Sequence, residues 1–478
     1  MGGAKPSEPT GTMIHKKVDP RPHEETLNPT FGSRYLSGEI PRYRIPDEEM
    51  PPQSAYQVIH DELMLDGNAR LNLATFVTTW MEPEARKLME ETFEKNMIDK
   101  DEYPQTAEIE MRCVNILSEL YNAPQGAKPC GCSTIGSSEA AMLGGMALKW
   151  RWRKRREQVG RPTDRPNLVL GIDVQVCWEK FCRYWEIEPR YIPIQEGRYT
   201  VNAEEVVSRC DENTIGVVGV LGTTFTGQYE PIGEIDAALD KLNGETGWEI
   251  PLHVDAASGG FVAPFLQPDF AWDFRLKWVK SINVSGHKYG LVYPGVGWIL
   301  WRDEEELPEE LVFKVNYLGG DMPTFALNFS RPGNQVVAQY YNFLRLGREG
   351  YTRVMSASRE TARFLARGLS GIGPFEILGP GEDIPVLAVR IRPDAETNYT
   401  VFDVSEKARH RGWLIPAYTL PEDATHVAVL RIVVKEDFSR DMASLLLEDF
   451  RRILASFESE PRREAKNDPV DGKHRPKC

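Results

Sequence analysis

The stretch that decides the fold is HVDAASGG at residues 253–260, followed by SINVSGHKYG at residues 281–290. Both begin as short apolar runs of strand length, and the first run ends at Asp255 while the second ends just before Lys288. The carboxyl ends of neighbouring parallel strands meet at one edge of an α/β sheet, where such sheets bind their ligands. We therefore expect this chain to hold a carboxylate and an amine side by side at that edge.

A lysine and an aspartate in this arrangement predict a site for pyridoxal 5'-phosphate (PLP). The amine of Lys288 would form a Schiff base with the cofactor aldehyde, and Asp255 would keep the pyridine nitrogen protonated. By itself Asp255 could equally be a structural cap at the end of a strand. The small residues after it leave room for a flat ring, with the Ala257 methyl on one face and the planar side chain of Gln175 on the other.

Hydroxyl side chains at a predicted helix start indicate where the cofactor phosphate binds. The segment TIGSSE at 134–139 precedes a helix expected to begin at Ser137, so Ser137 and Ser138 lie among free backbone N–H groups that favour an anion. Taken alone, these residues would be an ordinary helix cap. With a cofactor lysine downstream, the phosphate is the natural anion, and Ser285 and His287 would complete its cradle.

The charge balance argues against several classes of partner. Lys and Arg number 57 against 71 Asp and Glu, for a net charge of −14, so the chain has no general attraction to nucleic acid or anionic membranes. The basic run KWRWRKRR at 149–156 ends a predicted helix, where cations complement the helix dipole. No apolar run approaches the roughly 20 residues of a membrane span, and no secretory signal is evident. We expect a cytoplasmic protein. The seven cysteines form no metal-ligand pattern, so no metal site is expected.

Apolar runs that alternate with helical segments predict an α/β protein with a mostly parallel sheet. The expected strands are 167–171, 215–221, 251–255, 280–284 and 296–301. A helix is expected from Glu84 to Asn96, with Leu88, Met89, Thr92 and Phe93 near one face. The expected parts of the chain are a proline-rich N-terminal arm at 1–59, a large domain at 60–345, a small α+β domain at 346–460 and a flexible tail at 461–478.

Several motifs resemble one enzyme family, the PLP-dependent group II amino-acid decarboxylases. They are GSSEA at 136–140, HVDAASGGF at 253–261, SGHKYG at 285–290 and NFSRPGNQVVAQYY at 328–341. Within that family, NLATFVTTWMEPEARKLM at 72–89 and LVFKVNYLGG at 311–320 are similar to the glutamate decarboxylases of bacteria and plants. The resemblance implies a type I (aspartate aminotransferase-like) fold, with a large, mostly parallel, seven-stranded sheet domain and a small α+β C-terminal domain. It also implies a homodimer or a hexamer, with each active site between two subunits.

The resemblance implies a role for each matching residue. Lys288 would be the Schiff-base lysine, Asp255 the partner of the pyridine nitrogen, and Gln175 the side chain that stacks on the ring. Thr224 would lie close to the cofactor. The implied phosphate ligands are Ser137, Ser138, Ser285, His287 and, from the neighbouring subunit, Ser330.

The implied reaction is the α-decarboxylation of L-glutamate to 4-aminobutanoate and CO2, with uptake of one proton. Thr75 and the N–H of Phe76 would hold the side-chain carboxylate, and the family pattern adds Asn96 and Asp99 from the partner subunit. A carboxyl group beside another carboxyl group raises the apparent pKa of the pair, which suggests a preference for acidic pH. Arg431 would orient the α-carboxylate, although outside the family context it would be an ordinary ion-paired strand arginine.

Two more residues gain roles from the resemblance. Lys288 or Tyr317 would return the proton to the product, and His474 would plug the site at neutral pH, unless the tail is an inert disordered segment. The tail has no Trp and contains three prolines, so calmodulin binding is not expected. Two other functions stay open. One is a PLP decarboxylase or lyase for another amino acid or an amine phosphate, and the other is a catalytically silent relative with an assembly role.

Overall fold

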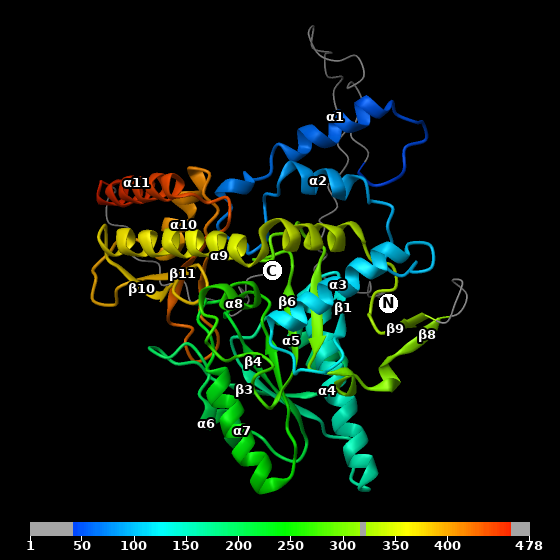
Figure 1. The fold of residues 1–478 in the computed structure, drawn as a ribbon. Coiled ribbons are helices and arrows are strands. Elements are labelled where there is room, and N and C mark those ends of the chain that lie inside the picture. Colours follow the sequence, from blue (N-terminus) through cyan, green and yellow to red (C-terminus); the bar gives the residue numbers. More distant parts are fainter. Residues whose placement is uncertain (1–41, 316–321, 460–478) are drawn as a thin grey trace, which may run out of the picture. The chain divides into compact units, whose positions relative to one another are not determined.

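A computed structural model describes residues 42–315 and 322–459 (Figure 1). Its contacts divide into two compact units, Met1–Gly67 and Asn68–Cys478. In the first unit, helix α1 (Pro52–Leu63) begins at a proline, whose missing N–H is not needed in the first turn of a helix. Helix α1 therefore begins inside the segment for which the sequence predicted an extended arm.

The second unit is built around a seven-stranded sheet with the strand order β1-β7-β6-β5-β4-β2-β3. Its strands are β1 (Cys130–Thr134), β2 (Asn167–Gly171), β3 (Glu188–Ile192), β4 (Thr214–Val220), β5 (Leu252–Asp255), β6 (Val279–Ser285) and β7 (Gly297–Trp301). Within this sheet β7 runs antiparallel to both neighbours, and the other pairs are parallel. Strands β2, β4 and β7 are buried throughout, which explains their continuous apolar runs. The predicted mostly parallel sheet is confirmed.

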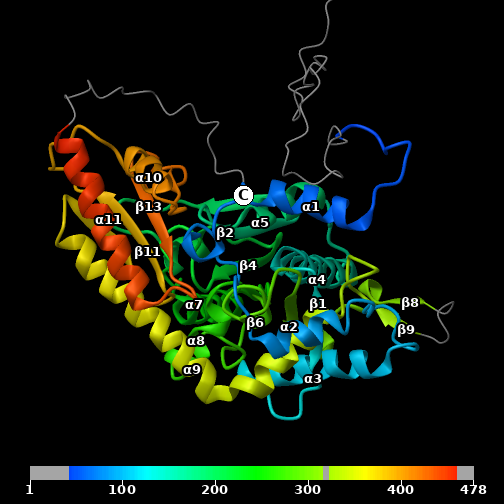
Figure 2. The same cartoon turned by 90° about the horizontal axis from the view of Figure 1, so that it is seen from above.

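Helices cover both faces of this sheet (Figure 2). Helices α4 and α5 contact each other on one face, and α2, α3 and α8 contact α9 on the other. Helices α6 and α7 lie in the connections between parallel strands. Such crossovers bring the carboxyl ends of β2, β4, β5 and β6 to one edge of the sheet. The helices are α2 (Pro83–Glu90), α3 (Pro104–Leu120), α4 (Ser137–Gln158), α5 (Val176–Tyr184), α6 (Ala203–Ser208), α7 (Ile232–Thr246), α8 (Ala263–Leu266) and α9 (Asn334–Ser370).

A four-stranded antiparallel sheet with the order β10-β11-β13-β12 forms the C-terminal part. Helix α9 runs across the boundary expected at residue 345 and is interrupted at Gly347, whose φ of 55° is left-handed and suits glycine. The sheet and its helices share a core that includes Phe375, Leu430 and Phe450. The α+β character of this part agrees with the sequence, while the domain boundaries stay a prediction. The elements are β10 (Phe375–Pro380), β11 (Val386–Ile391), α10 (Val401–His410), β12 (Ala417–Thr419), β13 (Ala428–Val433) and α11 (Arg440–Glu458).

One predicted helix is wrong in its length. The sequence predicted a helix from Glu84 to Asn96, whereas α2 ends at Glu90. The hydroxyl of Thr92 donates to the carbonyl oxygen of Leu88 (2.6 Å), which competes with the backbone ladder of a continuing helix. Phe93, expected near the same helix face as Met89, is 69 % exposed, so no core contact stabilises another helical turn.

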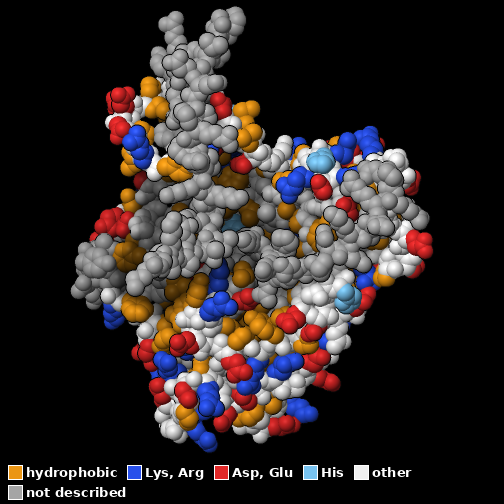
Figure 3. Space-filling model, turned by 180° about the vertical axis from the view of Figure 1, so that it is seen from behind, with side chains coloured by type: hydrophobic (Ala, Val, Ile, Leu, Met, Phe, Trp, Pro, Cys, Tyr) orange, Lys and Arg blue, Asp and Glu red, His pale blue; other side chains and the backbone are white. Residues whose placement is uncertain are grey.

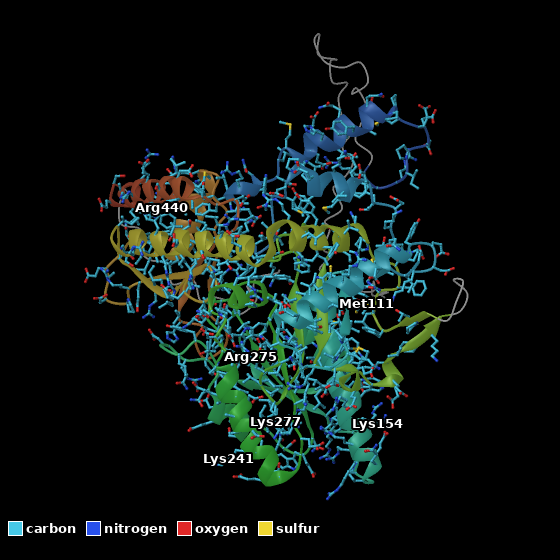
Figure 4. All side chains as sticks on the ribbon, in the orientation of Figure 1. Met111, Lys154, Lys241, Arg275, Lys277 and Arg440 are labelled. Carbon is cyan, nitrogen blue, oxygen red and sulfur yellow. The ribbon has the colours of Figure 1, made fainter. Side chains whose placement is uncertain are left out.

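The surface carries charges of both signs. Acidic and basic side chains are interspersed over the lower part of the face shown in Figure 3. In the basic run at the end of α4, Arg151 pairs with Glu306 and Lys154, labelled in Figure 4, pairs with Glu310 at 3.6 Å. Over residues 42–315 and 322–459, no helix is long and apolar enough to cross a bilayer, and no group of three or more His, Cys, Asp or Glu side chains is placed to hold a metal ion.

Candidate active site

A cavity of about 370 Å³ lies at the carboxyl ends of β2, β4, β5 and β6 and at the start of α4. Most of the residues that the sequence predicted to bind the cofactor line it. They are Ser137, Ser138, Gln175, Thr224, Asp255, Ala257, His287 and Lys288. Residues far apart in the sequence therefore meet at the edge of the sheet where the strand pattern placed them.

Asp255, the last residue of β5, is held by three hydrogen-bond donors. Its Oδ2 accepts from Trp178 Nε1 (2.9 Å), and its Oδ1 accepts from Asn283 Nδ2 (2.9 Å) and from the Ala257 N–H (3.1 Å). Asp255 is 5 % exposed, so these donors replace water around a buried carboxylate. They fix the side chain in one orientation toward the cavity.

Behind Asp255 lies a buried histidine that sequence reasoning missed. His253 Nε2 lies 2.7 Å from Asn283 Oδ1, and its Nδ1 lies 2.7 Å from the Ser281 hydroxyl. The amide nitrogen of Asn283 donates to Asp255, so its oxygen faces His253 and Nε2 must carry the proton. Burial lowers the pKa of His253 and keeps the ring neutral. The polar residues at alternate positions of β6 were the sequence signal, since they share one face of that strand.

The phosphate cradle, defined as Ser137, Ser138, Ser285 and His287, forms where α4 begins. Ser285 Oγ donates to Ser137 Oγ (2.7 Å), which joins the end of β6 to the helix start. His287 Nδ1 is buried without a hydrogen-bond partner in the described structure. A side chain at Gly136 would approach the His287 ring within 3.2 Å, so glycine keeps this space open. Free N–H groups, hydroxyls and an unpaired ring nitrogen suit a bound anion.

His287 contributes to the cradle in its neutral form. Burial, followed by the positive charge of Lys288, lowers the pKa of His287 to about 4. A neutral imidazole still donates one hydrogen bond. In the described structure, the cradle therefore relies on hydroxyl and N–H donors more than on net positive charge.

Lys288 lines the cavity, and its main chain is held by Thr78. Its Nζ lies 3.1 Å from Ser258 Oγ and 5.0 Å from the centroid of the Phe76 ring. The Thr78 hydroxyl donates to the Lys288 carbonyl oxygen (2.7 Å), and the Thr78 N–H donates to the His287 carbonyl oxygen (2.8 Å). These contacts bring the predicted substrate-binding segment next to the lysine.

Arg431, on β13, also lies next to Phe76. Its Cζ is 5.0 Å from the Phe76 ring centroid, and its Nη atoms donate to the Thr224 carbonyl oxygen (2.9 Å) and the Ala74 carbonyl oxygen (2.6 Å). Within the described residues it pairs with backbone carbonyls and with no carboxylate, unlike an ion-paired strand arginine. Thr75 is exposed, and its hydroxyl accepts from Asn72 Nδ2 (3.1 Å).

The remaining predicted residues lie elsewhere. Asn96 Nδ2 donates to Ser330 Oγ (3.3 Å), and Asn96 Oδ1 accepts from the Arg331 N–H (3.0 Å). Asp99 follows in the adjoining turn, where its N–H donates to the Asn96 carbonyl oxygen (3.1 Å). None of Asn96, Asp99 and Ser330 lines the cavity of its own chain. Tyr317 and His474 lie outside the described residues.

The sequence matches a family model described as the pyridoxal-dependent decarboxylase conserved domain over residues 46–392. The chain belongs to this family. It is 55 % identical to a glutamate decarboxylase of Aliivibrio fischeri, an alignment that covers 94 % of this chain and 96 % of the relative. It is 51 % identical to a glutamate decarboxylase of Solanum lycopersicum over 97 % of this chain and 94 % of that protein. The solved structure of a Lactobacillus brevis glutamate decarboxylase matches with a TM-score of 0.88 and 45 % identity, over 91 % of this chain and 99 % of that one.

The cofactor of the decarboxylase is PLP, and the cavity has the donor set that PLP requires. Asp255 would hold the pyridine nitrogen, Lys288 the aldehyde carbon and the cradle the phosphate. Bound PLP supplies an electron sink for the carbanion left at the substrate α-carbon. Gln175 lines the same cavity, where its Oε1 accepts from the Cys177 N–H (2.6 Å) and caps α5, so its predicted stacking on the ring stays a prediction.

Proposed function

We propose that this decarboxylase removes CO2 from L-glutamate, takes up one proton and forms 4-aminobutanoate. The observation that carries the proposal is similarity of more than half of the residues, over nearly the full length, to proteins called glutamate decarboxylase. The cavity supports it, because Lys288 Nζ lies 5.0 Å from the ring of Phe76, in the segment that also carries Thr75. No described feature of the site favours a different amino acid.

Each side chain of the site has its own role in binding the cofactor or the substrate. Lys288 supplies the amine that holds the cofactor, and Asp255 keeps a proton on the ring nitrogen. Arg431 carries a positive charge next to Phe76 and would orient the α-carboxylate of the substrate for bond cleavage. Thr75 and the Phe76 N–H would hold the distal carboxylate. Holding the substrate so that the bond to its α-carboxylate is oriented for cleavage lowers the activation barrier more than it strengthens binding of the ground state.

Substrate choice gives the first test. Incubation with PLP and a panel of amino acids, with CO2 release measured from pH 4 to pH 8, should show turnover of glutamate. The value of kcat/KM for glutamate should exceed that for aspartate, one methylene shorter, by at least ~10-fold. Release from aspartate or an aromatic amino acid but not from glutamate would refute the substrate assignment. Absence of CO2 from every amino acid would favour a silent relative.

We further propose a homodimer or a higher oligomer in which Asn96, Asp99 and Ser330 complete the cavity of the neighbouring subunit. The proposal is supported by their location: they cluster together, yet none of them lines the cavity of the same chain. The two-fold symmetry of such a dimer would give it two equivalent sites.

Mixing two inactive variants tests this arrangement. Lys288→Ala chains, unfolded and refolded together with Asn96→Ala/Asp99→Ala chains, should regain about a quarter of wild-type activity, because half of the random dimers contain one intact composite site. The matched control mixes Lys288→Ala with Asp255→Asn, two changes in the same cavity wall, and should regain none. If neither the test mixture nor the control mixture regains activity, each site lies within one chain.

A further inference from the structure

Two acidic side chains are buried together beside the cofactor cavity. Asp173 is 1 % exposed and Glu230 is fully buried. Both oxygens of Asp173 and Oε1 of Glu230 have no hydrogen-bond partner in the described structure. Asp173 lines the cavity. Neither Asp173 nor Glu230 is among the site residues predicted from the sequence.

The two carboxyl groups face the same point. A side chain at Gly171 would collide with Asp173 Oδ1 and would lie 3.1 Å from Glu230 Oε1. The other atom that such a side chain would meet is a methyl of Val201, 2.9 Å away. Within the described residues, no lysine, arginine or histidine pairs with either carboxyl group. Asp255, on the neighbouring β5, adds a further negative charge that reaches Glu230.

A buried pair of this kind holds a proton. Two ionised carboxylates without a cation would be very unfavourable in a buried, apolar site, whereas one proton lets one group donate to the other. Burial raises the pKa of Asp173 to about 7. Burial, followed by the negative charge of Asp173, raises the pKa of Glu230 well above its usual range.

The pair lies where two cavity loops meet. Asp173 belongs to the turn between β2 and α5, which also carries Gln175. Glu230 closes the loop after β4, which carries Thr224: its Oε2 accepts from the Val220 N–H (2.6 Å), and its own N–H donates to the Val220 carbonyl oxygen (3.0 Å). A hydrogen bond between the two carboxyl groups would therefore tie one loop to the other.

We propose that Asp173 and Glu230 share one proton and act as a positioning pair that joins these two loops, so that the PLP site is held in place only while the pair keeps its proton. Loss of the proton places two like charges in a buried site, and their repulsion separates Gln175 from Thr224. The inference rests on the PLP cofactor but not on the identity of the amino-acid substrate.

The test measures cofactor affinity and thermal stability instead of turnover. PLP dissociation constants and the melting temperature of the cofactor-free protein are recorded from pH 5 to pH 8 for the wild type, Asp173→Asn and Glu230→Gln. Each amide keeps the shape of a protonated acid. Asp164→Asn, at an exposed carboxylate, is the matched control. All other titratable groups are common to the four proteins, so the ratio of wild-type to variant dissociation constants isolates the pair.

The sign of the effect follows from the raised pKa values. The folded protein binds these protons more tightly than the unfolded chain, so the wild type loses stability as pH rises from the ordinary carboxyl range towards 7, through Asp173, and on through the raised pKa of Glu230. We expect the dissociation-constant ratio to rise about tenfold between pH 5 and pH 8 for both amide variants, and to stay near one for the control. If the PLP dissociation constants of the wild type and of both amide variants change in parallel with pH, the proposal is overturned. Failure of both variants to fold at pH 5, where the pair is protonated in the wild type, would also overturn it.

Discussion

Replacing Lys288 with alanine is expected to lower turnover of glutamate by at least ~10⁴-fold and to remove the visible absorbance band of the bound cofactor. The substitution removes the only lysine amine among the described residues that line the cavity. Both the covalent attachment of PLP and the nearest proton carrier are lost together. Steady-state kinetics and an absorbance spectrum of the purified protein measure the two losses.

Folding is controlled separately. The Lys288 main chain stays held by Thr78, so the melting temperature of the cofactor-free variant should stay close to that of the wild type. Lys277→Ala, at an exposed lysine labelled in Figure 4 that pairs with Asp240, is the matched control and should keep full activity. A Lys288→Ala protein that keeps its band and its turnover would show that the lysine has another role.

The second large effect is expected at Asp255. Asp255→Asn keeps the shape of the side chain but removes the charge that stabilises a proton on the pyridine nitrogen, so kcat should fall by about 10²–10³-fold. The substitution also turns one amide hydrogen toward a donor. Either Trp178 Nε1 or Asn283 Nδ2 then loses its acceptor, which costs about 1–3 kcal/mol of stability.

Two comparisons separate these effects. Asn283→Ala removes one donor to Asp255 and leaves the charge, so it should lower stability while reducing kcat far less than Asp255→Asn. Asp164→Asn controls for the loss of an exposed carboxylate and should change neither quantity. Equal kcat values for Asp255→Asn and the wild type would exclude the proposed pairing with the cofactor ring.

Much of the fold was predictable because its strands are local features. Strand β2 begins and ends where the sequence predicted, and the runs near β4, β5, β6 and β7 differ from the observed strands by a residue or two. Strands buried on both faces need consecutive apolar residues, and that pattern is visible without any tertiary information. The helix from Glu84 failed because the pattern of apolar residues continued beyond the point at which the core stops.

The site was predictable to the extent that its residues follow strands or begin helices. Ser137, Asp255 and Lys288 each have such a position, and all three line the cavity. The supports behind them have no comparable local pattern. Asn283 gains its role because it lies opposite Asp255 in the β5–β6 register, and that pairing depends on which strands become neighbours.

The sequence by itself determined the cofactor chemistry and the class of fold, since a lysine and an aspartate after two apolar strands and a hydroxyl-rich helix start are patterns within short segments. Only the tertiary structure decided which groups act together across the sheet: His253 with Asn283, Arg431 with Phe76, and Asp173 with Glu230. The physical reason is that hydrogen bonds, burial and carboxyl repulsion depend on distances between segments. Those distances are set by strand order, register and crossover connections, which no single segment of the sequence encodes.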